Sequence, residues 1–347
     1  MSSTLNWPEL LSSLVRGEDQ PTAATAWAMG QILNGDATPA QIAAFVIGLR
    51  CKGETVAELT GLADVMIEFA TPIEIGGPAV DVVGSGGDRS NTVNISTMAA
   101  IVAAAAGAKV VKHGNRAASS ACGAADVLEA LGVVLDLTPE AQQRVVDQVG
   151  IGFLFAAYYH PALRYAGPTR RELGIPTTFN FLGPLANPAQ PISQAVGVSD
   201  PRMAELMAGV FASRGNYGLV VHGGDGLDEL TTTTSSTVWL YADGEVERMV
   251  LDPLHLGLPR ATIADLVGGD SGANADVIRK VVSGQSGPVR DIVVLNAAAA
   301  LVAYGKPTAG RLEEDFADEL ERARQAIDSG AAQTKLGEWI EATHSAG

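Results

Sequence analysis

The sequence has few cysteines and no long apolar run, and both absences narrow the possible protein classes. Its 347 residues include only Cys51 and Cys122, which are too far apart for a metal-binding or redox motif. No stretch approaches the roughly 18 uncharged apolar residues of a membrane-spanning helix, and the first residues, MSSTLNWPELL, lack the basic and apolar regions of a secretion signal. We therefore expect a cytoplasmic protein with no disulfide framework and no membrane partner.

Basic residues are also scarce. The chain carries 23 Lys and Arg against 39 Asp and Glu, a net charge of −16, which argues against a nucleic-acid partner because phosphates require a basic surface. Hydrophobic residues make up 47% of the chain and charged residues only 18%, which argues against disorder. The length is typical of about two domains.

The first 71 residues predict a small all-helical domain. Asn34-Gly35 ends one helix, and residues 38–41 begin the next with a capping box and a proline at the first helical position. Residues 55–58 form a second capping box ahead of another apolar helix face. The helical pattern ends at residues 72–78, PIEIGGP.

From residue 79 onwards, short β-branched runs alternate with helical stretches. Strands are expected at 79–84, 108–114, 218–222 and 237–241, and helices at 95–107, 124–132, 201–213, 273–282, 289–304 and 312–327. A hairpin is expected at 242–244. The sequence therefore predicts an α/β fold: a small all-helical N-terminal domain plus a larger α/β domain over residues 72–347, with a central mixed or parallel sheet flanked by helices.

Two loops that follow predicted strands are suited to anions. The loop at 84–88, GSGGD, offers successive backbone N–H groups beside a helix start. It is neither a Rossmann fingerprint, since Arg89 replaces the last glycine, nor a Walker loop, so a purely structural turn remains an alternative. Asn94, Ser96 and Thr97 add polar side chains at the helix start, where capping explains only one of them.

The second loop, residues 112–120, follows a strand at its carboxyl end, where α/β sheets usually bind ligands. Its Lys112 and Arg116 suggest local compensation for an anionic ligand in an acidic chain, although a solvated loop remains possible. His113 taken alone is more often a structural partner than a catalyst. Ser119 and Ser120 add hydroxyl groups.

Two further motifs carry charged groups. Arg170 lies in an expected helix, and its planar fork is suited to a carboxylate, although a surface ion pair would explain it equally well. Asp225, Asp228 and Glu229 follow another strand and repel one another unless a cation lies among them. Such oxygen ligands favour Mg²⁺, and an exposed acidic turn is the alternative.

These motifs occur in one order: GSGGD, NIST, KHGNRAASS, RREL, FNFLGPLANP and DGLDELTT. With this order and spacing the chain resembles the anthranilate phosphoribosyltransferases of tryptophan biosynthesis over nearly its whole length. The resemblance implies a homodimer built through the helical domain and an active site between the two domains. It also implies transfer of the phosphoribosyl group from phosphoribosyl pyrophosphate (PRPP) to anthranilate. The reaction would require Mg²⁺, with two ions per subunit. We expect residues of about 168–190 to complete the helical domain.

The resemblance also assigns residues to each ligand. For PRPP it implies Gly84, Gly87, Asp88, Thr92, Asn94, Ser96, Thr97, Lys112, Gly114, Asn115, Arg116, Ser119 and Ser120. For anthranilate it implies Gly84, His113, Asn115, Arg170 and Pro184. For metal it implies Ser96, Asp228 and Glu229. The chain departs from the usual family pattern at Ser85, Arg89, Cys122 and Ala124.

No general base is expected, because the aromatic amine of anthranilate is already unprotonated near neutral pH and needs positioning more than deprotonation. Two alternatives remain open at this stage. One is a pyrimidine-nucleoside phosphorylase, although such enzymes usually carry a further C-terminal domain. The other is a non-catalytic nucleic-acid-binding relative of the same fold, which the acidic net charge disfavours.

Overall fold

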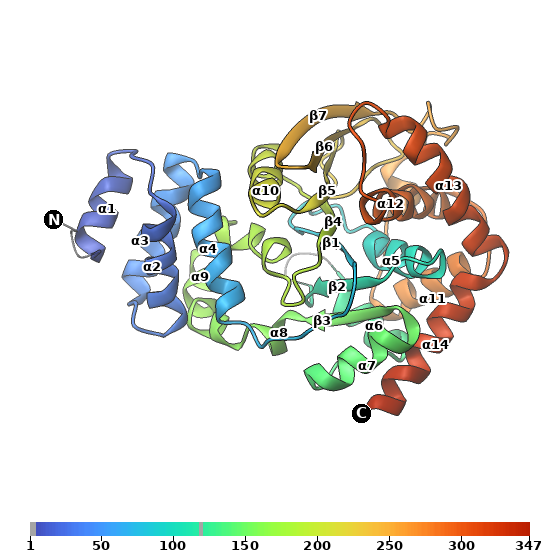
Figure 1. Cartoon of the computed structure of the whole chain (residues 1–347), viewed down its shortest axis with the longest axis horizontal. Helices are drawn as coiled ribbons and strands as arrows, with labels where there is room; N and C mark the ends of the chain where they lie inside the picture. The colour runs from blue at the N-terminus through green and yellow to red at the C-terminus, as the bar shows by residue number, and fades with distance from the viewer. Residues whose placement is uncertain (1–4, 118–120) are drawn as a thin grey trace.

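The structure is a computed structural model that describes residues 5–117 and 121–347. Four helices form a bundle at the N-terminal end, on the left of Figure 1: α1 (Trp7–Val15), α2 (Thr22–Leu33), α3 (Pro39–Lys52) and α4 (Val56–Glu68). Both predicted capping boxes are present. In the second, the Thr55 N–H donates to the Glu58 carboxylate at 2.9 Å, and the Glu58 N–H donates to the Thr55 hydroxyl at 3.3 Å.

A later segment packs against this bundle. It comprises α8 (Ala156–Tyr159), the 3₁₀ turn η1 (Pro161–Tyr165), α9 (Gly167–Leu173) and the turns η2 (Thr178–Phe181) and η3 (Pro184–Ala186). Within it, α9 and η2 contact α3, η1 contacts α2, and η3 contacts α4. These contacts place the segment against the bundle, and the expectation that residues of about 168–190 complete the helical domain stays a prediction.

The rest of the chain is built on one seven-stranded sheet. Its strands are β1 (Val80–Gly84), β2 (Val110–Gly114), β3 (Ile151–Phe155), β4 (Ser193–Gly197), β5 (Tyr217–Gly223), β6 (Ser236–Ala242) and β7 (Glu245–Leu251). Their order across the sheet is β3-β2-β1-β4-β5-β6-β7. The first five are parallel, whereas β6 and β7 are antiparallel to their neighbours. This confirms the predicted fold class, with a mixed sheet.

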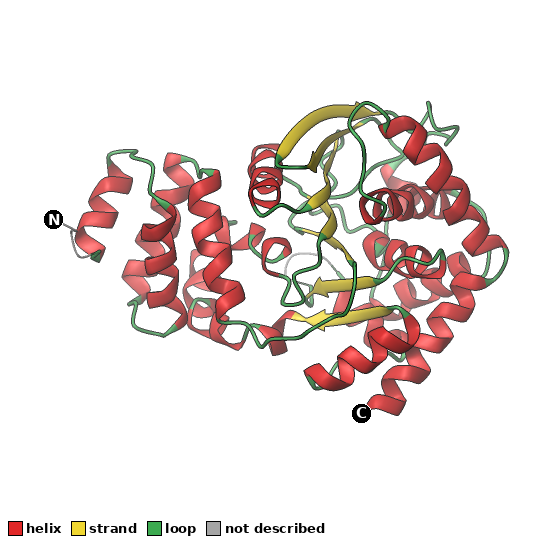
Figure 2. Ribbon diagram, viewed as in Figure 1, coloured by secondary structure: helices red, strands yellow, loops and turns green. Residues whose placement is uncertain are grey.

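Helices cover both faces of the sheet (Figure 2). On the side away from the bundle lie α5 (Ile95–Ala105), α6 (Ala124–Leu131), α7 (Pro139–Val149), α11 (Ser271–Val282), α12 (Pro288–Tyr304), α13 (Leu312–Asp328) and α14 (Ala331–Ala346). On the bundle side lies α10 (Pro201–Ser213). Among the described residues, no helix is long and apolar enough to cross a bilayer.

The alternation of side chains along each strand divides the interior into two cores. Val82 joins the core beneath α5 and α12, whereas its neighbour Val83 joins the core beneath the bundle. Leu240 and Trp239 divide in the same way. The bundle-side core runs without interruption from α1 to the sheet, so the division at residues 71 and 72 stays a prediction.

The strand order places a topological switch point between β1 and β4. From β1 the chain proceeds outward to β2 and β3, and it then returns to β4 on the other side of β1. Ligands of open α/β sheets bind outside the carboxyl ends of the strands at such a point. The ends of β1 and β4, at Gly84 and Gly197, therefore mark where a site is expected.

Candidate active site

A cavity of about 330 Å³ lies where the carboxyl ends of β1 and β2 face the helical bundle. Met66 of α4 and Arg170 of α9 line it from one side, and the two strand ends line it from the other. It brings together fifteen predicted site residues: Gly84, Gly87, Asp88, Thr92, Asn94, Ser96, Lys112, His113, Gly114, Asn115, Arg116, Arg170, Pro184, Asp228 and Glu229.

Among the described residues, one predicted site residue does not line the cavity. Thr97 is buried within α5, with 1% of its surface exposed, and does not line the cavity. Thr97 is the third residue of α5, directly after Ser96, and the turn of the helix points its side chain away from the side that Ser96 presents. Ser119 and Ser120 lie outside the described residues.

The glycine-rich loop takes a backbone path that favours glycine. Gly86 and Gly87 have φ of 70° and 91°. Arg89 and Asn91 follow with φ of 60° and 50°, in the left-handed region that a long side chain rarely adopts. Arg89, which departs from the family pattern, therefore has a backbone conformation that glycine would adopt with less strain.

Two glycines let an acidic segment approach the strand ends. A Cβ at Gly197 would lie 1.5 Å from the carbonyl oxygen of Asp228, and a Cβ at Gly84 would lie 2.3 Å from the Asp228 carboxylate. The N–H of Gly86 donates to that carboxylate at 2.6 Å. The absence of side chains at these strand ends thus sets the position of Asp228 over the switch point.

Three carboxylates meet at this position. Ligand oxygens of Asp88, Asp228 and Glu229 all lie within 4.8 Å of one another. Burial, followed by the charge of Asp88, raises the pKa of Asp228 to about 7, and burial together with Asp228 raises the pKa of Glu229 well above its usual range. In the described part of the chain, none of the three forms an ion pair with lysine, arginine or histidine. Such a set of hard oxygen donors fits a divalent cation.

Lys112 is the nearest buried cation. Its Nζ donates to the Val82 carbonyl and, at 3.1 Å, to the hydroxyl of Ser96. Burial lowers its pKa to about 8, while the charges of Asp81, Glu229 and Asp228 oppose the shift. A cation held by neutral oxygens in this way keeps its charge available to an anionic ligand in the cavity.

His113 is held as a neutral ring. Its Nδ1 lies 3.0 Å from the carbonyl oxygen of Gly183, which can only accept, so Nδ1 carries the proton. Burial, followed by the neighbouring His160, lowers its pKa to about 3. The ring centroids of the two histidines are 5.1 Å apart, and the Nε2 of His113 is buried with no hydrogen-bond partner among the described residues. This ring therefore fits a positioning role in the wall of the cavity.

The bundle side of the cavity carries Arg170 of α9, which has no acidic partner among the described residues. Among the described residues, Arg170 forms no ion pair, and its guanidinium lies 5.5 Å from the centroid of the Phe179 ring. Burial lowers its pKa from the ordinary value. A partly buried guanidinium of this kind is suited to a planar carboxylate.

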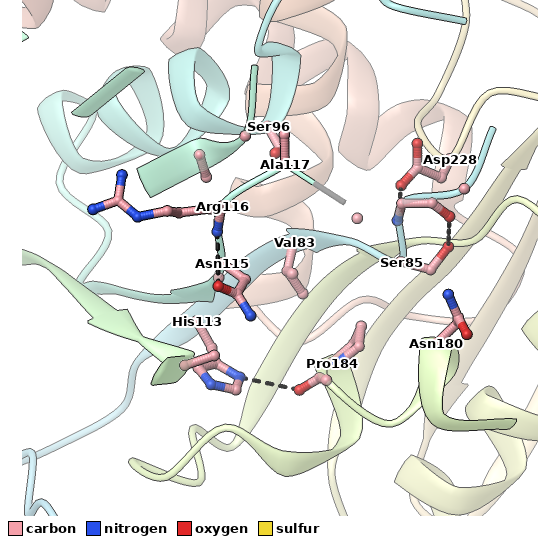
Figure 3. Close-up of a pocket in the computed structure, with 18 of the residues that line it drawn as sticks. Val83, Ser85, Ser96, His113, Asn115, Arg116, Ala117, Asn180, Pro184 and Asp228 are labelled. Carbon is pink, nitrogen blue, oxygen red and sulfur yellow. Dashed lines mark hydrogen bonds between the residues drawn. The ribbon is translucent and has the colours of Figure 1, made fainter. Parts of the chain in front are cut away.

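Asn115 and Arg116 diverge although they are neighbours (Figure 3). The amide of Asn115 points toward the middle of the view, whereas the guanidinium of Arg116 points away from it. That guanidinium pairs with Glu129 at 2.5 Å and Asp126 at 3.0 Å, and both carboxylates raise its pKa. Arg116 thus lines the cavity while its charge is used by α6.

Several lining residues were missed from the sequence. Asn180 faces the cavity (Figure 3), and its Oδ1 accepts the N–H of Thr177 at 3.0 Å, which fixes its amide orientation. Phe179, His160 and Gly183 also line the cavity. The signal for Asn180 was present in the FNFLGP motif, but a capping role would have explained it equally well.

The remaining departures from the family pattern can also be placed. The hydroxyl of Ser85 accepts the N–H of Ser199 at 3.1 Å and lies 3.0 Å from the Gly86 carbonyl, so the loop hydroxyl is retained. Cys122 and Ala124 line the cavity beside α6. Burial raises the pKa of the Cys122 thiol.

Fold and site together define a glycosyltransferase with a helical bundle and an α/β domain. The glycosyl transferase family model for the helical bundle domain matches residues 8–70, and the model for the a/b domain matches residues 76–333. The chain belongs to the anthranilate phosphoribosyltransferase family. It is 56% identical to the anthranilate phosphoribosyltransferase of Salinispora arenicola over 98% of this chain and 97% of the relative.

Solved structures agree with this assignment. The anthranilate phosphoribosyltransferase of Thermus thermophilus superposes with a TM-score of 0.89 at 37% identity, covering 96% of this chain and 99% of that one. The Saccharomyces cerevisiae enzyme, solved in complex with PRPP and Mg, shares the fold with a TM-score of 0.83 at 24% identity, covering 98% and 94%. These relatives do not favour the phosphorylase or nucleic-acid-binding alternatives.

Proposed function

We propose that this chain transfers the phosphoribosyl group of PRPP to the amine of anthranilate. The products are N-(5-phosphoribosyl)anthranilate and pyrophosphate, as in the second step of tryptophan biosynthesis from chorismate. The observation that carries this proposal is that one cavity holds two complementary anion sites. Asp88, Asp228 and Glu229 can hold metal for a diphosphate, and Arg170 can receive a carboxylate.

The glycine-rich loop and Lys112 are proposed to bind PRPP. The loop at 84–88 offers backbone N–H groups, and the buried Lys112 adds positive charge beside Ser96. Cleavage of the bond between the anomeric carbon and pyrophosphate develops negative charge on the leaving oxygens. These donors lie at the strand ends, where that charge would appear, so they favour departure of pyrophosphate.

Magnesium is the proposed cofactor, with two ions per subunit. Asp228 and Glu229 would hold one ion, Asp88 lies close enough to contribute, and Ser96 is proposed as a contact of the other. Bound Mg²⁺ supplies charge neutralisation for the pyrophosphate leaving group. The raised pKa values of the two buried acids fit this role, since a divalent cation would relieve their mutual repulsion.

The bundle side of the cavity is the proposed anthranilate site. Arg170 would bind the carboxylate, while Asn115, His113 and Pro184 border the aromatic ring. None of these residues is required as a general base, because the aromatic amine is already neutral. Their proposed work is to hold the amine near the anomeric carbon and to exclude water.

We also propose a homodimer formed through the helical bundle and a cytoplasmic location. The proposal for the dimer rests on the family resemblance. The proposal for the location rests on the two cysteines and on the biosynthetic reaction.

The deciding experiment is a fluorescence assay. Anthranilate mixed with the purified chain, PRPP and Mg²⁺ should lose its fluorescence, and leaving out PRPP or chelating Mg²⁺ should prevent the loss. Unchanged fluorescence, together with phosphorolysis of thymidine or uridine, would replace this function with that of a nucleoside phosphorylase.

A further inference from the structure

Asn274 on α11 lies outside the cavity but contacts two of its lining residues, Asn94 and the thiol of Cys122. Only 2% of its surface is exposed, and it does not line the cavity. Its Nδ2 donates to the Oδ1 of Asn94 at 2.9 Å, and its own Oδ1 accepts the N–H of Gly269 at 2.8 Å. Because a backbone N–H can only donate, this second bond fixes which end of the Asn274 amide faces Asn94.

The orientation is passed on to Asn94. Since Asn274 presents a donor, Asn94 must present its oxygen, and its Nδ2 then points to the carbonyl of Cys122, 3.2 Å away. Both amide orientations follow from a single backbone N–H. Asn94 is thereby held between α11 and the loop that precedes α6.

In this arrangement the Asn94 side chain does not cap α5, the helix that it precedes. Asn94 is the N-cap residue of α5, where asparagine usually accepts an N–H of the first turn through its side chain. Here no side-chain cap bond is made, and the oxygen is used by Asn274 instead. The start of α5, which faces the cavity through Ser96, is therefore left without its usual side-chain cap.

Residues 266–268, which lie just before α11, are hydrogen-bonded to residues 91–93, which lie just before α5. The N–H of Val93 donates to the Leu266 carbonyl at 2.9 Å, and the N–H of Gly268 donates to the Asn91 carbonyl at 2.8 Å. Thr92 and Val267 form an antiparallel bridge. These contacts tie the position of Asn274 to residues 91–94, so the two cannot move independently.

We propose that Asn274 is a positioning residue for PRPP, acting through Asn94: it draws that side chain off the start of α5 and so keeps the helix end open to a phosphate group. The inference rests on the proposed function. Helix N-termini bind phosphate through backbone N–H groups and the helix dipole. Without Asn274, the amide of Asn94 is free to cap α5 and competes with the substrate for those groups.

The test compares three variants in steady-state kinetics and in direct titration of PRPP. Asn274→Ala should raise the KM and the Kd for PRPP by about three- to tenfold, the size of one lost hydrogen bond. The KM for anthranilate and kcat at saturating PRPP should stay near wild type. In an Asn94→Ala background, Asn274→Ala should add nothing, because the partner through which it acts is gone.

Asp270→Ala is the matched control. Asp270 caps α11 by accepting the N–H of Ala273 at 2.9 Å, so its loss weakens the same helix end without touching Asn94. It should leave the KM for PRPP unchanged. If Asn274→Ala folds poorly, Asn274→Asp serves instead: it keeps the bond from Gly269, presents a second acceptor to Asn94, and should weaken PRPP at least as much.

Three results would overturn the proposal. They are wild-type PRPP affinity in both Asn274 variants, an effect of Asn274→Ala that persists in the Asn94→Ala background, and an equal loss in Asp270→Ala. Failure of the proposed function is a separate result, because the wild-type chain itself would then not bind PRPP.

Discussion

At the scale of single residues, two arginines that line the cavity differ in whether a carboxylate of the chain pairs with them. Arg170 has no acidic partner among the described residues, whereas Arg116, which the sequence placed in the same site, is paired with Glu129 and Asp126. A chain with 16 more acidic than basic residues has many carboxylates that could neutralise an arginine. An arginine that stays unpaired at a cavity wall is therefore the better candidate for an external carboxylate.

Replacing Arg170 with alanine tests that assignment. Arg170→Ala should raise the KM for anthranilate by about tenfold to a hundredfold, the equivalent of one charge-assisted contact. Arg171→Ala, at an exposed neighbouring position, is the control and should leave the KM unchanged. Steady-state kinetics with varied anthranilate measures both, and an unchanged KM in Arg170→Ala would remove Arg170 from the site.

The acidic cluster makes a different prediction. Asp228→Asn combined with Glu229→Gln should raise the Mg²⁺ concentration needed for half-maximal activity by about tenfold or more, because two oxygen ligands lose their charge. Asp243→Asn, on an exposed hairpin, is the control. A Mg²⁺ titration identical to that of the wild type would show that these acids are not the ligands.

Most of these residues can be identified from the sequence, but their hydrogen-bond and ion-pair partners cannot. The motif at 112–116 predicted an anion site, yet nothing in it distinguishes Lys112, which forms no ion pair among the described residues, from Arg116, which pairs with two carboxylates. That distinction depends on α6, which brings Glu129 to Arg116. Asn274 gave no signal at all, since its role depends on a contact with a residue 180 positions away.

At the scale of elements, strands with several β-branched residues were predicted, whereas β3 and β4, which contain only one each, were missed. The ranges 79–84 and 237–241 correspond to β1 and β6, and 201–213 matches α10. The central strand β4, with the sequence SQAVG, was missed because serine, glutamine and glycine are poor strand formers. Its buried Ser193 and Gln194 side chains donate to the Ala79 and Pro191 carbonyls, so these polar groups are satisfied inside the sheet.

Other elements were missed for similar reasons. β3 contains Gly152, where a side chain would collide with Gln142 and Val146 of α7, so the small residue reflects close helix packing. α7 and α14 were not predicted either, although Thr138 caps α7 through a bond from Ala141. The contacts that stabilise these elements are tertiary, and a local pattern does not report them.

The end of β4 carries a prediction of its own. Gly197→Ala should displace the backbone of Asp228, since the new Cβ would fall 1.5 Å from its carbonyl oxygen. We expect kcat/KM to fall by about a hundredfold, as for a misplacement near 1 Å. Gly337→Ala in α14 has open space around it and should instead stabilise the chain by roughly 0.5–1 kcal/mol.

Kinetics and thermal unfolding on both variants distinguish the cases. Wild-type activity in Gly197→Ala would show that the acidic segment can shift without consequence for the reaction. A loss of activity in Gly337→Ala would mean that small changes anywhere in the α/β part disturb the site.

At the scale of the whole molecule, burial of neutral histidine couples stability to pH. The folded pKa of His113, about 3, lies below the ordinary value of 6.5, so the unfolded chain binds a proton that the folded chain does not. Its stabilising contribution is complete above pH 6.5 and is lost as the pH falls toward 3. Between pH 7 and pH 5 this residue alone should cost about 2 kcal/mol of unfolding free energy.

Urea denaturation at a series of pH values measures this loss. His113→Gln should reduce the decrease in unfolding free energy between pH 7 and pH 5 by about 2 kcal/mol relative to wild type. His255→Gln is the control, because that ring is two-thirds exposed, and it should keep most of the wild-type slope. An unchanged slope in His113→Gln would mean that this histidine is protonated in the folded chain.

The cavity described above has one wall from helices and another from strand ends, and this division bears on inhibitor design. A compound that joins a benzoate to a diphosphate by a tether of suitable length would engage both walls at once. Its second contact would form within the complex already made, at a high effective concentration, so its affinity would exceed that of either fragment.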